Sequence, residues 1–132
     1  MSRERVLTGR PLETTIGFSR AIRVGNRIEV SGTAPTNADG STAGGDDPYL
    51  QAKACFAIIK AAIEELGGRL EDVYRTRMLL TDPAYGDAVG RAHGELFGDI
   101  KPAATMVAVS ALLNPEWLVE IEAWAEIEDG SS

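Results

Sequence analysis

The stretch RAIRVGNRIEVSGTAP, residues 20–35, decides how the fold begins, because it has the pattern of a β-hairpin. Apolar residues recur at every second position on both sides of Gly25-Asn26, with the period that is typical of half-buried strands. Glycine and asparagine both tolerate the positive φ that a tight two-residue turn requires. We therefore predict two paired strands here, with a weaker edge strand over residues 5–9 beside them.

Two helices are predicted, each after an aspartate followed by proline, at residues 47–48 and 82–83. An aspartate can cap a helix, and proline suits the first helical position. The first helix is mostly apolar up to Gly67, so it is expected to bury most of its circumference. The second contains three internal glycines and is closed by Gly98. Residues 36–47, which are mainly small and polar, are expected to form a mobile loop.

Three further strands are predicted, over residues 73–82, 105–112 and 117–127. The resulting order, β-β-β-α-β-α-β-β, indicates an α+β fold in which a mixed sheet carries two helices on one face. On the last strand, one face is apolar and the opposite face combines glutamates with Leu118 and Trp124. One layer of helices leaves that face uncovered, so it is expected to form either an oligomer interface or a solvated surface with scattered apolar side chains.

The composition fits a single domain over residues 1–132, with a disordered tail over about 128–132. The net charge of −7 disfavours nucleic acid or an anionic membrane as a partner. One cysteine allows no intrachain disulfide, which fits a reducing cytoplasm. No run of about 18 apolar residues is present to span a membrane. We therefore expect a cytoplasmic protein.

The residues alone point to little chemistry. His93 and Cys55 are the only residues of their kinds and fall on separate predicted helices, whereas zinc sites need three or four ligands, so no metal is expected. No serine lies in a GxSxG motif, and the glycine-rich loop lacks the lysine of a phosphate-binding loop. Glu120 and Glu122 share a strand face, which could suit acid–base chemistry, but solvated strand faces produce the same pattern far more often.

Four segments in this order, GFSRAIRVGNRIEVSGTAP, EDVYRTRMLLTD, KPAATMVAVSAL and VEIEAWAEI, resemble the Rid family, also called YjgF/YER057c/UK114. The resemblance covers about residues 16–127. It implies a chorismate-mutase-like α+β fold that assembles as a homotrimer with clefts between subunits. Active members hydrolyse reactive enamines and imines, such as 2-aminoacrylate, to the keto acid and ammonia, and they need no metal or organic cofactor.

The resemblance also implies where a site would lie, and at one position of that site the sequence differs from that of active members. Active members carry an arginine that binds the substrate carboxylate at the position of Ala104, in the sequence PAAT. No other arginine obviously replaces it, although Arg77 and Arg91 stay open as substitutes. A standard 2-aminoacrylate deaminase is therefore not expected.

At the other positions that correspond to site residues of active members, some residues are retained and others are replaced. A cleft tyrosine of active members corresponds to Phe18, and an asparagine of the second helix corresponds to Gly90. Ser31 and Gly32 are retained, as is Glu120, whose family counterpart is thought to hold a water for hydrolysis. The full set of candidate site residues is Phe18, Ser31, Gly32, Gly90, Ala104, Thr105 and Glu120.

Two functions follow as hypotheses. The protein is either a deaminase-like hydrolase on an uncharged or otherwise atypical substrate, with Glu120 positioning water, or a non-catalytic small-molecule-binding or interaction protein. An apolar pocket containing Phe18, Ala104, Thr105 and Met106 favours a less charged ligand. Ribonuclease activity, which is also attributed to the family, is disfavoured by the acidic charge.

Overall fold

A computed structural model describes residues 2–128. It contains one six-stranded sheet in the order β1-β2-β3-β6-β4-β5, in which only the β4–β5 pair is parallel. The strands are β1 (Arg3–Val6), β2 (Ala21–Val24), β3 (Arg27–Thr33), β4 (Val73–Leu80), β5 (Ala103–Ala108) and β6 (Val119–Glu126). The helices are α1 (Pro48–Glu65) and α2 (Gly86–Phe97), with short helical turns η1 (Glu13–Gly17), η2 (Leu70–Asp72) and η3 (Pro83–Tyr85). The predicted element order is confirmed.

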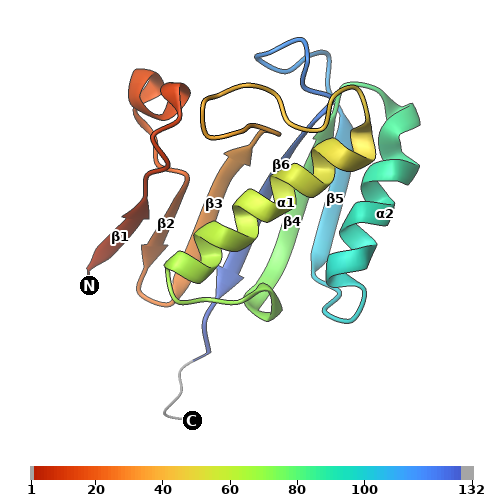
Figure 1. The fold of residues 1–132 in the computed structure, drawn as a ribbon. Helices are drawn as coiled ribbons and strands as arrows, with labels where there is room; N and C mark the ends of the chain where they lie inside the picture. Colours follow the sequence, from red (N-terminus) through yellow and green to blue (C-terminus); the bar gives the residue numbers. More distant parts are fainter. Residues whose placement is uncertain (1, 129–132) are drawn as a thin grey trace.

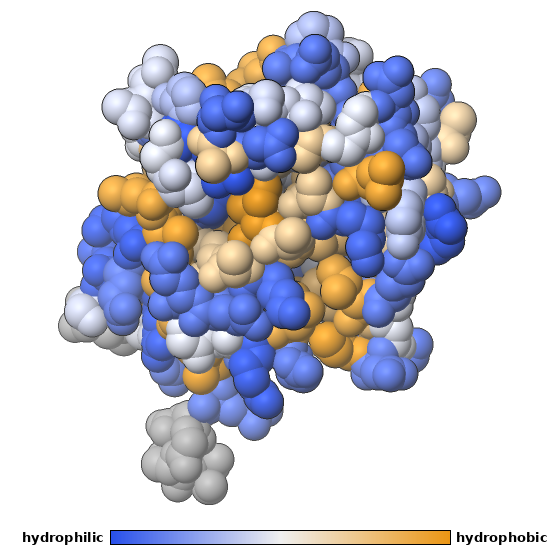
Figure 2. All heavy atoms as spheres, viewed as in Figure 1, coloured by the Kyte–Doolittle hydropathy of each residue, from blue (hydrophilic) through white to orange (hydrophobic). Residues whose placement is uncertain are grey.

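Both helices cover the same face of the sheet, as predicted (Figure 1). The β6 side chains on that face, Val119, Ile121, Ala123 and Ala125, are buried in the core. Seen from the same side, the molecule is mostly hydrophilic, with apolar side chains gathered around its middle (Figure 2). The helices therefore hold the sheet from one side, and within the described chain no second layer covers the other side.

The hairpin forms as predicted, with Ala21 opposite Val30 and Gly25 at a positive φ of 62°. The predicted edge strand over residues 5–9 is shifted, because β1 spans Arg3–Val6. After Val6 the chain leaves the sheet and enters η1, which returns it to β2. This excursion brings the residues between β1 and β2 to the end of the sheet where the site lies.

The first helix is capped as predicted. The Asp47 carboxylate accepts hydrogen bonds from the backbone amides of Tyr49, at 2.9 Å, and Leu50, at 3.3 Å. The prediction for the second helix was wrong in detail, because Asp82 caps the short turn η3 and α2 begins only at Gly86. The loop over residues 36–47 is closed on itself by a bridge between Thr36 and Thr42.

Three strands end earlier than predicted, and one of them, β6, spans Val119–Glu126 instead of 117–127. β4 stops at Leu80 instead of 82, and β5 spans Ala103–Ala108 instead of 105–112. β5 is an edge strand that pairs only with β4, and its Met106 and Val107 are more than one third exposed. The tail expected to be disordered lies outside the described residues except for Glu128. No helix in the described part is long and apolar enough to cross a membrane.

Candidate functional site

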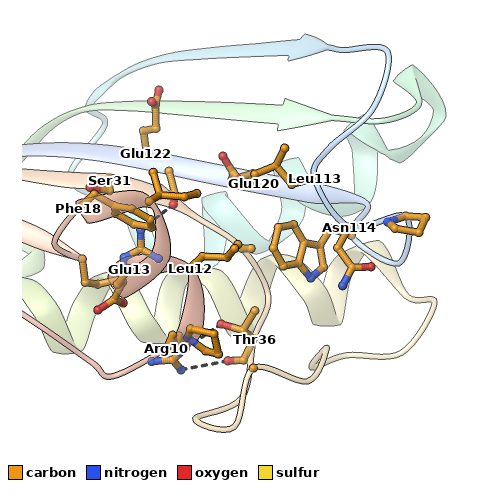
Figure 3. A pocket seen from close by; sticks show the side chains of 18 residues that line it. Arg10, Leu12, Glu13, Phe18, Ser31, Thr36, Leu113, Asn114, Glu120 and Glu122 are labelled. Atoms are coloured by element: carbon orange, nitrogen blue, oxygen red, sulfur yellow. Dashed lines mark hydrogen bonds between the residues drawn. The ribbon is translucent and has the colours of Figure 1, made fainter.

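A cavity of about 750 Å³ opens at the end of the sheet, between η1, the β3–β6 pair and the segment that leads into β6 (Figure 3). Four of the seven candidate residues line it: Phe18, Ser31, Gly32 and Glu120. Phe18 and Ser31 lie on one side of the close-up view, and Glu120 lies with Leu113 on the other (Figure 3). Within one chain, the cavity therefore brings together the retained part of the predicted site.

Glu120 lies directly against Gly32 on the neighbouring strand. A Cβ atom at position 32 would lie 2.5 Å from Glu120 Oε2, so only glycine leaves room for this carboxylate. The β3–β6 register is interrupted between Val30 and Thr33, and such irregularities often redirect side chains beside functional sites. Gly32 and the irregular register together place the Glu120 carboxyl group over β3.

Burial raises the pKa of the Glu120 carboxyl group above its usual range. The positive charge of Arg20 opposes this effect, and the negative charge of Glu122 adds to it. Glu122 also lines the cavity and is paired with Arg77 of β4. Glu120 is therefore poised to exchange a proton nearer to neutral pH than an ordinary glutamate.

Ser31 and Phe18 have structural contacts. The Ser31 hydroxyl donates to the carbonyl of Ser19 at 2.8 Å, which joins β3 to the segment before β2. Phe18 follows η1 with an extended backbone, and its ring lies 5.3 Å from the guanidinium carbon of Arg20. The serine hydroxyl thus has a partner already, and the aromatic ring flanks a cation.

Arg20 is the cavity residue that the sequence analysis missed. It is only 4% exposed, and its Nη2 donates to the Gly32 carbonyl at 2.7 Å. Burial lowers the pKa of Arg20, whereas the charges of Glu13 and Glu120 act in the opposite direction. A signal was available, because Arg20 is two residues after Phe18 in an extended segment and so falls on the same side of the chain.

Hydrogen bonds of other lining residues fix the walls of the cavity. The Glu13 carboxylate accepts hydrogen bonds from the backbone amide and the hydroxyl of Thr8, and Arg10 Nε donates to the Thr36 hydroxyl at 2.8 Å. The Trp117 indole N–H is buried and has no acceptor among the described residues. These contacts anchor η1 to its neighbours, as Figure 3 shows for Arg10 and Thr36.

Gln51 fixes the segment that leads into β6. Its side chain is completely buried and donates to the carbonyls of Gly45, at 2.7 Å, and Glu116, at 2.9 Å. Its Oε1 accepts from the backbone amide of Leu118 at 2.8 Å. One side chain of α1 thus joins the loop before this helix to the cavity wall.

The other three candidates lie elsewhere in the chain. Ala104 and Thr105 are on β5, which β4 and β6 separate from β3, and Thr105 Oγ1 accepts from Arg75 at 3.0 Å. Gly90 is on α2, where a Cβ atom would lie 4.0 Å from Met106 of β5. One chain therefore carries two separate groups of candidate residues, a group in the cavity and a group at the β5 edge.

Neither of the arginines considered as substitutes is free in the cavity. Arg77 is paired with Glu122, and Arg91 lies 4.0 Å from the centre of the Tyr49 ring on the helical side. Residues 2–128 contain no group of three or more His, Cys, Asp and Glu side chains that could hold a metal ion. Burial raises the pKa of Cys55 strongly, which disfavours its reactive thiolate.

The fold and the cavity define the class of small α+β domains with one helical layer on a six-stranded sheet. Residues 8–127 match the family described as Endoribonuclease L-PSP. The chain is 41% identical over 118 residues to an uncharacterized protein of Streptomyces coelicolor, covering 89% of this chain and 87% of that one. It is 34% identical over 125 residues to a RutC family protein of Pyrococcus abyssi, covering 95% of this chain and 98% of that one.

The similarity extends to solved structures. The crystal structure of Rv2704 from Mycobacterium tuberculosis, a member of the YjgF/YER057c/UK114 family, superposes with a TM-score of 0.87 at 39% identity, covering 96% of this chain and all of that one. The chain belongs to this family, which is the Rid family that its sequence motifs indicate.

Proposed function

We propose that the protein is a cytoplasmic homotrimer of single Rid-like domains, each spanning residues 1–132, with small-molecule-binding clefts between subunits. The separation of the two residue groups within one chain supports this assembly. A neighbouring subunit could bring its Ala104, Thr105 and Gly90 to the cavity that holds Glu120, so that one cleft would contain both groups. The exposed apolar edge of β5 and the uncovered sheet face provide the surfaces that such an assembly would bury.

In this cleft the protein acts as a deaminase-like hydrolase, and Glu120 positions the attacking water. The observation that carries this role is a partly buried carboxyl group on the cavity wall with a raised pKa. Water would add to the carbon of a C=N bond while one of its protons passes through Glu120 to the nitrogen, which gives a carbinolamine. The C–N bond of this intermediate would then break as its hydroxyl proton passes to the nitrogen, so that ammonia leaves and the carbonyl product remains. The reaction would need no metal or organic cofactor.

The substrate is atypical. Ala104 stands where active relatives carry the arginine that binds the carboxylate of 2-aminoacrylate, and losing a bidentate clamp typically lowers kcat/KM by orders of magnitude. The test uses imines released from small amino acids by an amino-acid oxidase. We expect little acceleration of their hydrolysis by the purified protein. A rate equal to that of an arginine-containing relative would contradict the assignment.

The same assay tests the role of Glu120 once a substrate is found in a panel of imines, some with and some without a carboxylate. Glu120→Gln should abolish the acceleration, while Glu126→Gln, at an exposed position of the same strand, should leave it unchanged. Equal rates for Glu120→Gln and the parent protein would remove Glu120 from the mechanism.

The second candidate is a small-molecule-binding protein without turnover. The observation that favours it is the loss of three polar groups together, at Phe18, Gly90 and Ala104. If no imine of the panel is hydrolysed faster but a ligand binds to the trimer, this candidate replaces the first. We do not extend the ribonuclease activity in the family description to this chain, because its net charge of −7 opposes RNA binding.

A further inference from the structure

Arg20 is a buried charge whose hydrogen-bonding capacity is mostly unused. A guanidinium group has five N–H donors, and within residues 2–128 only Nη2 makes a hydrogen bond, to the Gly32 carbonyl. Its Nε is buried and has no acceptor in the described part of the chain. Burying a charged group that has few hydrogen-bond partners is unfavourable, so this arrangement needs an explanation.

The nearest acids do not supply a direct partner. No carboxylate oxygen of the described residues lies within the 4.0 Å of an ion pair with Arg20. Glu13 is held by Thr8, and Glu120 lies over Gly32, so both act on Arg20 only through their longer-range charge. The Phe18 ring flanks the guanidinium from another side but accepts no conventional hydrogen bond.

The guanidinium is fixed where a ligand could use it. Arg20 belongs to the cavity wall, and the Gly32 carbonyl and the Phe18 ring limit its movement. A fixed guanidinium loses little conformational entropy when it binds a planar anion, which makes it well suited to a carboxylate. Because Nε is buried, the donors that could meet such a group are those on the two Nη atoms, of which Nη2 also bonds the Gly32 carbonyl.

The outer part of the cavity is apolar. Leu12, Ile16 and Leu113 line it and are 38%, 58% and 78% exposed, respectively. Large apolar side chains so exposed at one opening can gain by covering an apolar part of a ligand. The cavity thus combines a buried cation with an apolar entrance.

We propose that Arg20 is the anion-binding residue of this cavity, and that the ligand is a small organic anion whose apolar part lies against Leu12, Ile16 and Leu113. This inference rests on the proposed function only in taking the cavity as the ligand site. It replaces the expectation of an uncharged ligand, because that expectation considered only the arginine missing at position 104. The charge lies on the same chain and the same cavity wall as Gly32, next to Glu120.

A matched pair of ligands tests the charge requirement on the unaltered protein. Hexanoate and hexanamide have the same chain length but differ in charge, and their binding is measured by isothermal titration calorimetry. We expect hexanoate to bind at least about tenfold more tightly, as charge-assisted hydrogen bonds require. Butanoate should bind more weakly than hexanoate, because it covers less of the apolar entrance.

Variants then assign the effect to Arg20. Arg20→Gln should remove the preference for hexanoate over hexanamide, and Arg20→Lys should retain part of it. Arg27→Gln is the matched control, since Arg27 is an exposed arginine at the start of β3, outside the cavity. Circular dichroism checks the fold, and if Arg20→Gln does not fold, Arg20→Lys takes its place, with a weakened preference for hexanoate as the expected result and an unchanged preference as the result that would overturn the role of Arg20.

The outcomes separate this inference from the proposed function. Equal binding of hexanoate and hexanamide, or an unchanged preference in a folded Arg20→Gln variant, would overturn the role of Arg20 but leave the cavity as a ligand site. Binding of neither compound would overturn the ligand class inferred here. The trimer and imine experiments would then still decide the proposed function independently.

Discussion

Glu120 and Gly32 show how a single missing side chain shapes this site. The carboxyl group of Glu120 occupies the space that a Cβ atom at position 32 would fill. Its partial burial has a thermodynamic consequence, because a group that titrates differently in the folded and unfolded states makes stability depend on pH.

Replacing Glu120 by glutamine should stabilise the protein at neutral pH. The folded-state pKa of Glu120 is raised, so folding favours its protonated form. The stabilisation that this form provides is complete below the unfolded pKa of about 4.5 and is lost as the pH rises through the folded-state value. Glutamine resembles the protonated form at every pH.

Thermal unfolding followed by circular dichroism should therefore give Glu120→Gln a higher Tm than the parent protein at pH 7.5 and nearly the same Tm at pH 4. The control, Glu126→Gln, removes an exposed carboxylate paired with Arg27 and should change the Tm little at either pH. A lower Tm for Glu120→Gln at pH 7.5 would mean that attraction to Arg20 outweighs the cost of burial.

Gly32→Ala should displace the Glu120 carboxylate without preventing folding. The added Cβ would lie 2.5 Å from Oε2, at the movable end of a side chain, so Glu120 can rotate away. Any hydrolysis or ligand binding that depends on Glu120 should fall at least about tenfold. Activity assays and calorimetry on the folded variant provide the measurement.

Gly94→Ala is the control for this substitution. Apart from the helix's own backbone, a Cβ at position 94 of α2 would meet no atom of the described residues within 4 Å, so this variant should gain about 0.5–1 kcal/mol of stability from helix propensity. If Gly32→Ala retained full Glu120-dependent activity, the close approach of the two residues would have no functional importance.

At the scale of elements, α2 is joined to the sheet by a histidine. His93 Nε2 lies 2.8 Å from the Thr76 hydroxyl of β4, and the His93 ring packs against Phe56 and Phe97. Burial lowers the pKa of His93 below its usual value of 6.5. Protonation of this ring therefore opposes the packing of α2.

The contribution of His93 to the free energy of unfolding should fall as the pH decreases from 7.5 through 6.5, because the unfolded chain then binds a proton that the folded chain resists. Urea unfolding across this range measures the change. His93→Gln keeps a polar group near Thr76 but does not titrate, so subtracting its profile removes the opposite contribution of Glu120. If the free energies of unfolding of the parent protein and of His93→Gln changed with pH in parallel, His93 would be excluded as the source of the pH dependence.

The elements also show how far sequence reasoning reaches. The hairpin and the cap of α1 depend on neighbouring residues, so both could be predicted and both are confirmed. The separation of Ala104 from Glu120 depends on the position of β5 at the far edge of the sheet, which no local pattern encodes. Arg20 was missed because its burial comes from β3 and η1, which pack around it only in the folded chain.

At the scale of the whole molecule, the edge formed by β5 offers a direct test of assembly. Light scattering on the parent protein should give a mass three times that of one chain. Val107→Lys places a charge on an exposed apolar position of β5 and should shift the protein towards monomers. Leu50→Lys makes the same change at an exposed position of α1, on the helical side, and should leave the trimer intact.

A parent protein that stays monomeric at micromolar concentration would contradict the trimer. If the trimer persists in both lysine variants, β5 does not contribute to the interface, and the residues at its edge cannot complete a neighbouring cavity.

The position of β6 affects how the chain acquires its fold during synthesis. β6 is the last described strand in sequence, yet it lies between β3 and β4 and joins the two halves of the sheet. Until residues 119–126 leave the ribosome, the hairpin half and the β4–β5 half each present an open edge at the place that β6 will fill. The nascent chain therefore passes through a stage with two unpaired edges, at which holding by a chaperone would protect it from aggregation.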